Sequence, residues 1–395
     1  MKAPVRVGFV LHAMQVAGAE VLTREMIRRL GSRIQPTVFC LDAIGSIGEE
    51  LRREGVDLVC FNRRPGRDWG VSLRMARAIR QRNLQVIHAH QYSPFFYAAL
   101  AKALCWGRPR LILTEHGRHY PDEITPERRA VNRLFLDRQA DAVTACCRFS
   151  AWGLSRNDGF AGARIAIIEN GIEADRYGPA ADKRLAKRQL GFDAERRHII
   201  HVARHHPVKD QATLLRGLAL VAADLADVDL LMVGDGPLRG ELEKLAGGLG
   251  IASRVKFLGV RSDIPRLMSA ADVFALTSLS EAASLTLLEA MASGLPVAAT
   301  AVGGNGEIVR HEQEGLLFPR GQAAACAASL RRLFREPGLK ERLGEAGRHR
   351  VLKHYRLDRT VEKYFELYRH LAGNSQDGNN HFFRHMKCIN PPLHG

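Results

Sequence analysis

The chain has 395 residues, which is too many for one ordinary hydrophobic core, so we expect two domains. Its composition, 46% hydrophobic and 25% charged, is that of a folded globular protein and excludes a disordered chain. No apolar stretch approaches the length that spans a bilayer. The net charge is +16, and residues 1–150 carry +10 of it, which favours nucleic acid, acidic lipid or a phosphorylated ligand as a partner. Charge taken alone is explained more simply by a basic, solvated surface.

Six apolar runs in the first half are typical of buried strands in a parallel sheet. They lie at residues 5–11, 36–41, 56–61, 85–90, 110–116 and 141–146. Helical patterns separate them, as at residues 20–30 and 72–82. The first run continues into a glycine-containing turn, so we interpret it as a strand and not as a signal peptide. Strands that alternate with helices predict a doubly wound α/β domain.

The pattern restarts in the second half, with strand-like runs at residues 197–204, 228–234, 254–259, 272–277 and 296–300. Residues 169–182, rich in Gly, Pro and Asp, are predicted to form a linker. We therefore predict two Rossmann-like α/β domains facing a cleft, with ligands at the carboxyl ends of the strands. The predicted parts are residues 1–172, residues 173–354, a helix over 355–372 with an apolar stripe, and a disordered tail over 373–395. The stripe consists of Val361, Tyr364, Phe365 and Tyr368.

The cysteine pattern argues against structural zinc and against a disulfide framework. The seven cysteines are an odd number, and they form neither a CxxC pair nor a cluster with histidine. A reducing cytoplasm fits this pattern best. Cys146 and Cys147 are adjacent, and we interpret them as small core residues at a strand end rather than as a redox pair.

Two glutamates in residues 280–300 lie where a ligand is expected. Glu281 stands in the loop beyond the strand at 272–277, and Glu289 lies about one turn into the helix that begins near Leu285. The segment 294–300 reads as a helix stop followed by a buried strand. The first amides of a helix lack partners within it and favour an anion. Carboxylates on both sides of such a phosphate site suit a nucleotide sugar, which has hydroxyls on both sides of its diphosphate.

The cations that a diphosphate needs occur in the loop beyond the strand at 197–204. Arg204 offers a planar fork to phosphate oxygens, and Lys209 acts as a point charge. The glycine-rich turns at 234–236 and 303–306 allow the backbone to approach a ligand closely.

Taken together, these segments resemble the retaining glycosyltransferases of family 4, also called glycosyltransferase group 1. That family has two Rossmann-like domains in the GT-B fold. The resemblance covers about residues 5–370 and is strongest in 198–320, and "AGAE" (17–20), "TEHG" (114–117) and "NGIE" (170–173) add weaker signatures. It implies an acceptor-side first domain, a donor-nucleotide-binding second domain, and a C-terminal helix that returns to the first domain.

The resemblance also implies roles for the donor-binding residues of the second domain. Glu281 lies beside the donor sugar and Glu289 binds the ribose hydroxyls. Arg204 and Lys209 hold the diphosphate and help the nucleotide leave. The start of the helix, formed by Ser284, Leu285 and Thr286, offers backbone amides to the donor.

In the first domain, His116 matches a histidine that faces the donor sugar and the reaction centre. Gly18 matches a glycine turn that lets this domain close over the donor. We interpret His88 and His90, at another strand end, as wall residues of the acceptor cleft. The family needs neither a metal nor a cofactor, and we find no convincing Asp-x-Asp metal motif in this sequence.

Three departures from the family pattern concern the donor side. Ala283 and Ser284 replace its usual Phe-Gly pair, Ala17 replaces the first glycine of its Gly-Gly-Ala-Glu turn, and Asp210 stands where glycine is common. We expect a changed sugar pocket, so the sequence does not name the sugar or the base.

The leading hypothesis is a cytoplasmic, retaining, metal-independent hexosyltransferase of polysaccharide or lipid-linked glycan biosynthesis. Its partners would be a nucleotide sugar and a glycan or lipid-linked glycan acceptor. The alternatives are a 2-epimerase on the same fold and a non-catalytic sugar-nucleotide binder. Nucleic acid ranks last as a partner, because basic residues do not alternate with aromatic ones. The oligomeric state is not predicted.

Residues 126–141 resemble a basic amphipathic helix, which predicts peripheral attachment to an anionic inner membrane face. Its predicted cations are Arg128, Arg129, Arg133 and Arg138, and its apolar residues are Val131, Leu134, Phe135 and Leu136. Arg63, Arg64 and Arg67 would add to the same face if the fold brings them near.

Overall fold

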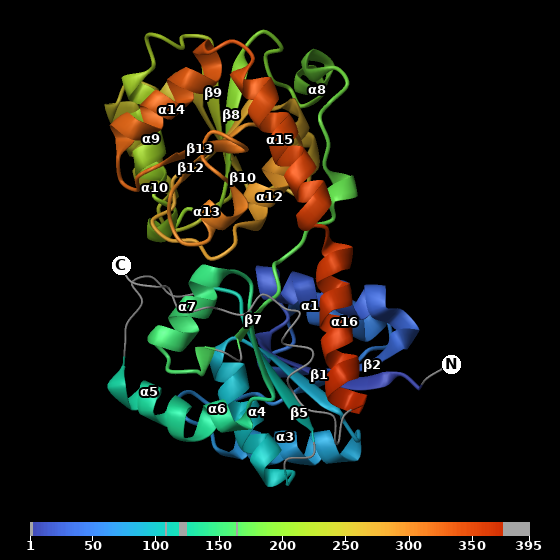
Figure 1. The fold of residues 1–395 in the computed structure, drawn as a ribbon. Helices are drawn as coiled ribbons and strands as arrows, with labels where there is room; N and C mark the ends of the chain where they lie inside the picture. Colours follow the sequence, from blue (N-terminus) through green and yellow to red (C-terminus); the bar gives the residue numbers. More distant parts are fainter. Residues whose placement is uncertain (1–2, 107–108, 118–124, 163–164, 374–395) are drawn as a thin grey trace. The chain divides into compact units, whose positions relative to one another are not determined.

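The structure is a computed structural model that describes residues 3–106, 109–117, 125–162 and 165–373 (Figure 1). The chain divides into two compact units: unit 1 comprises residues 1–169 and 358–395, and unit 2 comprises residues 170–357. The predicted tail lies outside the described residues except for Gly373, and so does Cys388. Each unit is a parallel α/β domain, as predicted.

Unit 1 is built on a seven-stranded sheet with the order β3-β2-β1-β4-β5-β6-β7. All of its strand pairs are parallel. The strands are β1 (Val5–Ala13), β2 (Ile34–Ala43), β3 (Asp57–Cys60), β4 (Val86–His90), β5 (Arg110–Glu115), β6 (Ala142–Ala145) and β7 (Ile165–Ile167). The order reverses direction between β1 and β4, which makes the carboxyl ends of these two strands the expected ligand edge.

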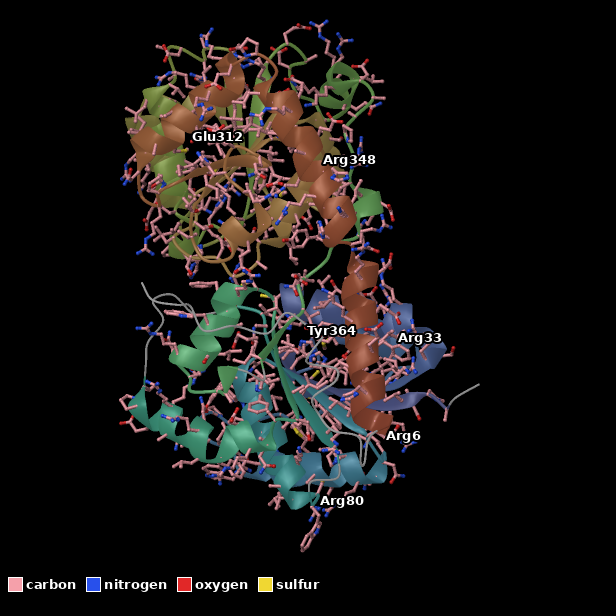
Figure 2. The ribbon with its side chains drawn as sticks, viewed as in Figure 1. Arg6, Arg33, Arg80, Glu312, Arg348 and Tyr364 are labelled. Atoms are coloured by element: carbon pink, nitrogen blue, oxygen red, sulfur yellow. The ribbon has the colours of Figure 1, made fainter. Side chains whose placement is uncertain are left out.

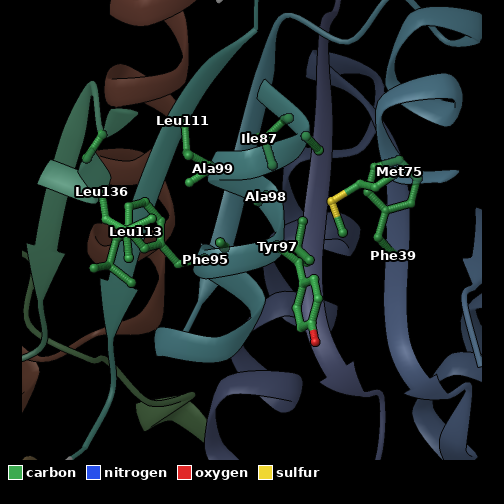
Figure 3. Close-up of a cluster of buried hydrophobic side chains, with 14 of the residues drawn as sticks. Phe39, Met75, Ile87, Phe95, Tyr97, Ala98, Ala99, Leu111, Leu113 and Leu136 are labelled. Atoms are coloured by element: carbon green, nitrogen blue, oxygen red, sulfur yellow. The ribbon is translucent and has the colours of Figure 1, made fainter. Parts of the chain in front are cut away.

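The described helices of unit 1 that precede unit 2 in the sequence connect these strands and cover the sheet. They are α1 (Gly18–Leu30), α2 (Gly45–Arg53), α3 (Gly70–Gln81), α4 (Tyr92–Leu104), α5 (Pro126–Val131), α6 (Asp137–Gln139) and α7 (Arg148–Arg156). A π-helical turn, Asn132–Leu136, joins α5 to α6. A large apolar core between the sheet and helices α3 and α4 includes Phe39, Met75, Phe95 and Leu113 (Figure 3). Cys146 and Cys147 are buried just after β6, as expected of small core residues.

The C-terminal helix α16 (Leu357–Gly373) packs into unit 1, as the resemblance implied. Its predicted apolar stripe is buried, and Tyr364 (labelled in Figure 2) and Tyr368 are fully enclosed. The exposed side of the helix is tied to the domain by ion pairs, for example Arg33 with Glu362 at 2.8 Å.

Unit 2 has a six-stranded parallel sheet with the order β10-β9-β8-β11-β12-β13. The strands are β8 (Arg197–Val202), β9 (Val228–Val233), β10 (Val255–Gly259), β11 (Val273–Leu276), β12 (Val297–Thr300) and β13 (Gly315–Phe318). The helices are α8 (Lys183–Gln189), α9 (Gln211–Leu220), α10 (Arg239–Gly248), α11 (Ile264–Ala270), α12 (Leu285–Ala292), α13 (Asn305–Ile308), α14 (Ala323–Arg335) and α15 (Leu339–His354). Apolar clusters fill both faces of the sheet. Here the strand order reverses between β8 and β11.

The boundaries of unit 2 lie at residues 169/170 and 357/358, whereas the sequence suggested 172/173 and 354/355. The reason is that the two connecting segments pair with each other within unit 2. Ile172 donates its N–H to the Tyr355 carbonyl and accepts from the Leu357 N–H, both at 2.9 Å. A Cβ at Gly171 would lie 2.6 Å from the Arg356 backbone, so only glycine fits this close approach.

Candidate functional site

In unit 2, the loops that follow β8 and β11 are bound to each other at the carboxyl edge of the sheet. The Thr277 hydroxyl donates to the Asp210 carbonyl at 2.8 Å, and the Leu279 N–H donates to the Val208 carbonyl at 2.8 Å. The Gly304 N–H, in the loop after β12, donates to the Glu281 carbonyl at 3.0 Å. Three loops that the sequence marked as ligand-binding are therefore held together.

These contacts bring two predicted site residues together as an ion pair. Lys209 Nζ lies 2.5 Å from Glu281 Oε1, and the Ser278 hydroxyl donates to the same oxygen at 2.6 Å. The side chains are 21% and 10% exposed, so the pair is reachable but largely shielded from water. The cation that the sequence assigned to a ligand diphosphate is thus neutralised here by the chain's own carboxylate.

Arg204 differs from Lys209 because its side chain is exposed and has no ion-pair or hydrogen-bond partner among the described residues. Its backbone is fixed, since its carbonyl accepts from Gln211 Nε2 at 2.8 Å. The loop ends at Asp210, which has a left-handed backbone (φ 44°, ψ 50°). This conformation explains why glycine is common at the position, and aspartate is tolerated because its carboxylate caps α9 through Thr213.

Helix α12 starts at Leu285, as predicted, and Ser284 is its N-cap. The Ser284 hydroxyl accepts from the Leu287 N–H at 3.4 Å and lies 3.2 Å from the Thr286 hydroxyl. The serine that departs from the family pattern therefore has a structural reason, because it satisfies a donor in the first turn. The amides of Leu285 and Thr286 lie in that turn, where the helix dipole favours an anion.

Glu289 lies on α12 and is half-buried. Burial raises the pKa of its carboxyl to about 7, although a hydrogen bond from Tyr177 and the charge of Arg176 act to lower it. Tyr177 and Arg176 come from the linker, where a short 3₁₀ helix (Ala174–Arg176) orients them. Sequence reasoning missed Tyr177, because a tyrosine in a Gly/Pro-rich segment shows no periodic signal.

In unit 1, His116 directly follows β5 and is half-buried. Its Nε2 lies 2.7 Å from Nδ1 of His90, and burial lowers the pKa of His116 to about 4. Gly18 begins α1, the helix whose Thr23 contacts His90. His116 and Gly18 belong to unit 1, whereas the other candidate residues belong to unit 2.

The interpretation of His88 and His90 as walls of an acceptor cleft is wrong. They are 0% and 1% exposed, because both side chains point into the interior of unit 1. His88 is held between Tyr368 of α16 and Thr114 of β5, with both hydrogen-bond distances at 2.6 Å.

Within the described ranges, no group of three or more His, Cys, Asp or Glu could hold a metal ion.

Comparison with known proteins shows which family this chain resembles. Residues 182–350 match the glycosyl transferases group 1, and residues 16–176 match glycosyltransferase family 4. The N-acetyl-alpha-D-glucosaminyl L-malate synthase of Bacillus anthracis is 28% identical over 317 residues, which is 80% of this chain and 82% of that protein. The D-inositol 3-phosphate glycosyltransferase of Salinispora arenicola is 30% identical over 307 residues, covering 72% of this chain and 68% of that protein.

Among solved structures, Anabaena Alr3699/HepE in complex with UDP and glucose has a TM-score of 0.80 at 23% identity, and the match covers 92% of this chain and 99% of that chain. This likeness identifies the GT-B fold. The sequence matches go further: the chain belongs to the family 4, group 1 glycosyltransferases.

Proposed function

We propose that the chain transfers a sugar from a nucleotide-diphosphate sugar to a glycan or lipid-linked glycan acceptor, with retention of anomeric configuration and without a bound metal. The observation that carries the proposal is the cation arrangement in unit 2. Exposed Arg204 stands in the same loop as Lys209, whose partner Glu281 precedes the amino end of α12. HepE, which has the same fold, was crystallised with UDP and glucose.

The proposed binding mode uses the charged side chains at the carboxyl edge of the unit 2 sheet. Arg204 binds the diphosphate with its exposed guanidinium, and the amides of Leu285 and Thr286 add the positive field of the helix terminus. Lys209 exchanges its contact with Glu281 for the diphosphate, which frees the carboxylate to accept from hydroxyls of the donor sugar. Glu289 accepts from the ribose hydroxyls.

In the proposed reaction, an acceptor hydroxyl bonds to the anomeric carbon while the bond from that carbon to the diphosphate oxygen breaks. The diphosphate leaves with the electron pair and takes the acceptor's proton. Arg204 and Lys209 stabilise the charge that grows on it, which is the role a metal ion plays elsewhere. For His116 and Gly18, which belong to unit 1, we propose the roles that the family resemblance implies.

The test is a panel of nucleotide sugars incubated with the protein, with and without a metal chelator, while release of free nucleotide is followed. We expect slow nucleotide release by hydrolysis with one donor, unchanged by the chelator. With an acceptor added, we expect a glycoside product with the donor's anomeric configuration. Binding without hydrolysis or transfer would favour a non-catalytic binder. An epimerised sugar nucleotide would favour the 2-epimerase alternative.

We further propose that unit 1 attaches peripherally to an anionic membrane surface through residues 126–139. Val131 and Leu134 are 44% and 70% exposed, and Arg129, Arg133 and Arg138 are exposed around them. Fewer residues are available on this surface than the sequence predicted, because Leu136 is buried and Arg128 pairs with Asp158. Within the described part of the chain, no helix is both long and apolar enough to cross a bilayer.

A further inference from the structure

A chain of hydrogen bonds in unit 1 runs from helix α1 to His116. It starts at Thr23, whose hydroxyl lies 3.3 Å from Nε2 of His90, and continues from Nδ1 of His90 to Nε2 of His116 at 2.7 Å. The rings of His90 and His116 are inclined by 10° and their centres lie 4.9 Å apart, which is compatible with an N–H···N bond in the ring planes. Thr23 and His90 are buried.

The direction of each hydrogen bond in this chain follows from the Thr23 hydroxyl. That hydroxyl has one hydrogen, and it donates it to the Ala19 carbonyl, an acceptor only, at 2.9 Å. His90 must therefore donate from Nε2 to the threonine oxygen. Burial and the neighbouring His88 and His116 keep the pKa of His90 well below its ordinary value, so its ring is neutral. Its Nδ1 then carries no hydrogen and can only accept.

The tautomer of His116 follows from that of His90. Its Nε2 must donate to the bare Nδ1 of His90, and burial lowers the pKa of His116 to about 4, so its ring is neutral as well. The Nδ1 of His116 is therefore an unprotonated acceptor, and it has no hydrogen-bond partner among the described residues.

Among the described residues, no group outside this series of hydrogen bonds competes for the nitrogens of His90. His88 lies 4.1 Å from it, ring centre to ring centre. Both nitrogens of His88 are already occupied, by Tyr368 and by Thr114, each at 2.6 Å. The tautomer of His90 is thus set by Thr23 alone.

We propose that His90 is a positioning residue that holds His116 in the Nε2–H tautomer, so that Nδ1 of His116 accepts a hydrogen bond from a hydroxyl of a bound substrate. The inference rests on the proposed function, because a bound sugar substrate supplies that hydroxyl. In the opposite tautomer His116 would present an N–H, which favours a carbonyl or another pure acceptor. The pairing of His116 with buried His90 therefore favours a substrate group that donates a hydrogen bond to His116.

The tautomer can be read without any substrate. Protein labelled with ¹⁵N at histidine should show His116, assigned through the variant His116→Gln, with a protonated Nε2 and an unprotonated Nδ1. His90→Leu removes the acceptor and should give a mixture of tautomers. His90→Asn should restore the native pattern, because its amide oxygen takes the place of Nδ1. Thr23→Val should weaken the bias, whereas Thr23→Ser should preserve it, and this pair replaces the first if His90→Leu does not fold.

Kinetics supply the second readout. His90→Leu should lower kcat about tenfold, while His90→Asn should retain activity within about threefold of the native protein, as expected for one neutral hydrogen bond. A native His116 protonated on Nδ1 would overturn the proposal, as would a tautomer unchanged in both His90→Leu and Thr23→Val. Absence of nucleotide release by the native protein would overturn the proposed function instead and would leave the tautomer result standing.

Discussion

At the scale of single residues, burial of the Glu289 carboxyl lowers the stability of the fold. Its carboxyl pKa is raised from an ordinary 4.5 to about 7, chiefly by burial, and Tyr177 offsets only part of this. Because the folded-state pKa is the higher one, the unfolded chain loses its proton first, and stability falls as pH rises from about 4.5 to about 7. A buried carboxylate kept at such a cost is typical of a binding residue.

Glu289→Gln should therefore stabilise the protein at neutral and higher pH. The free energy of unfolding should rise by about 2–3 kcal/mol more near pH 8 than near pH 5, as the pKa shift implies. Urea unfolding at both pH values measures this difference. An equal effect of the substitution at both values would contradict the assigned shift.

The same titration should appear in ligand binding. The ionised carboxylate accepts the ribose hydroxyls best, so the native protein should bind its nucleotide sugar more tightly as pH rises through about 7. The gain should reach about tenfold or more, the value of a hydrogen bond to a charged group. Calorimetric titration of Glu289→Gln should give weaker binding with a flatter pH dependence. An affinity equal to that of the native protein at high pH would remove Glu289 from the site.

Arg204→Ala and Lys209→Ala should both lower kcat more than they weaken donor binding, because charge grows on the diphosphate in the transition state. We expect a loss of about 100-fold for Arg204→Ala with unchanged stability, since that side chain is exposed and unpaired among the described residues. Lys209→Ala should also destabilise the protein, because it leaves the shielded Glu281 without its cation.

The double variant Lys209→Ala/Glu281→Gln separates the two effects of Lys209. It should regain stability, measured by urea unfolding, but not turnover, measured by nucleotide release. If both single variants match the native kcat, the assignment of the diphosphate to these cations is wrong.

Which site residues could be predicted depends on how they reach the site. Lys209 and Glu281 each follow a strand, so the sequence predicted that both would lie at the carboxyl edge of the sheet. The ion pair between them was not predicted, because the sequence does not show that their strands are neighbours. Tyr177 reaches Glu289 from a linker turn, and no pattern marks such a contact. His88 and His90 were misplaced, because a strand end does not reveal which helices cover its last side chains. Here α16 contacts His88 through Tyr368, and α1 contacts His90 through Thr23.

At the scale of elements, α12 is fixed at both ends. Ser284 caps its start, and its end forms a Schellman motif in which the Leu295 N–H donates to the Ala290 carbonyl at 3.0 Å and Gly294 takes φ 75°. The helix stop and the strand after it were predicted from the sequence. Strands β7 and β13 were not, because segments of three and four residues carry too little periodicity.

Helix α15 packs directly on this helix end. A Cβ at Gly344 would lie 2.3 Å from the Gly294 carbonyl oxygen, so Gly344→Ala should destabilise unit 2 by about 1–3 kcal/mol. Gly247 in α10 is the matched control, because nothing lies within 4 Å of its added Cβ. Gly247→Ala should stabilise by about 0.5–1 kcal/mol through helix propensity. Thermal unfolding of the two variants should shift in opposite directions, and equal shifts would contradict the packing argument.

At the scale of the whole molecule, the two α/β units were predicted because each repeats the same alternation of strand and helix. The surface chemistry was harder to predict. Of the four apolar residues expected on the face of residues 126–141, Val131 and Leu134 are exposed, whereas Leu136 is buried and Phe135 is partly packed against the core. A π-helical turn lies between α5 and α6, and sequence periodicity does not reveal such a turn.

The basic and apolar face formed by residues 126–139 should bind vesicles of anionic lipid but not neutral ones. High salt should release the protein from the vesicles. Each arginine near an anionic surface contributes roughly 1 kcal/mol, screened over a Debye length of about 8 Å. Arg129→Glu/Arg133→Glu should therefore weaken cosedimentation at least tenfold. Arg77→Glu/Arg80→Glu, on exposed positions of α3, changes the net charge equally and should have a smaller effect. Equal losses for the two pairs would indicate a response to net charge alone, and no binding by the native protein at low salt would exclude the membrane face.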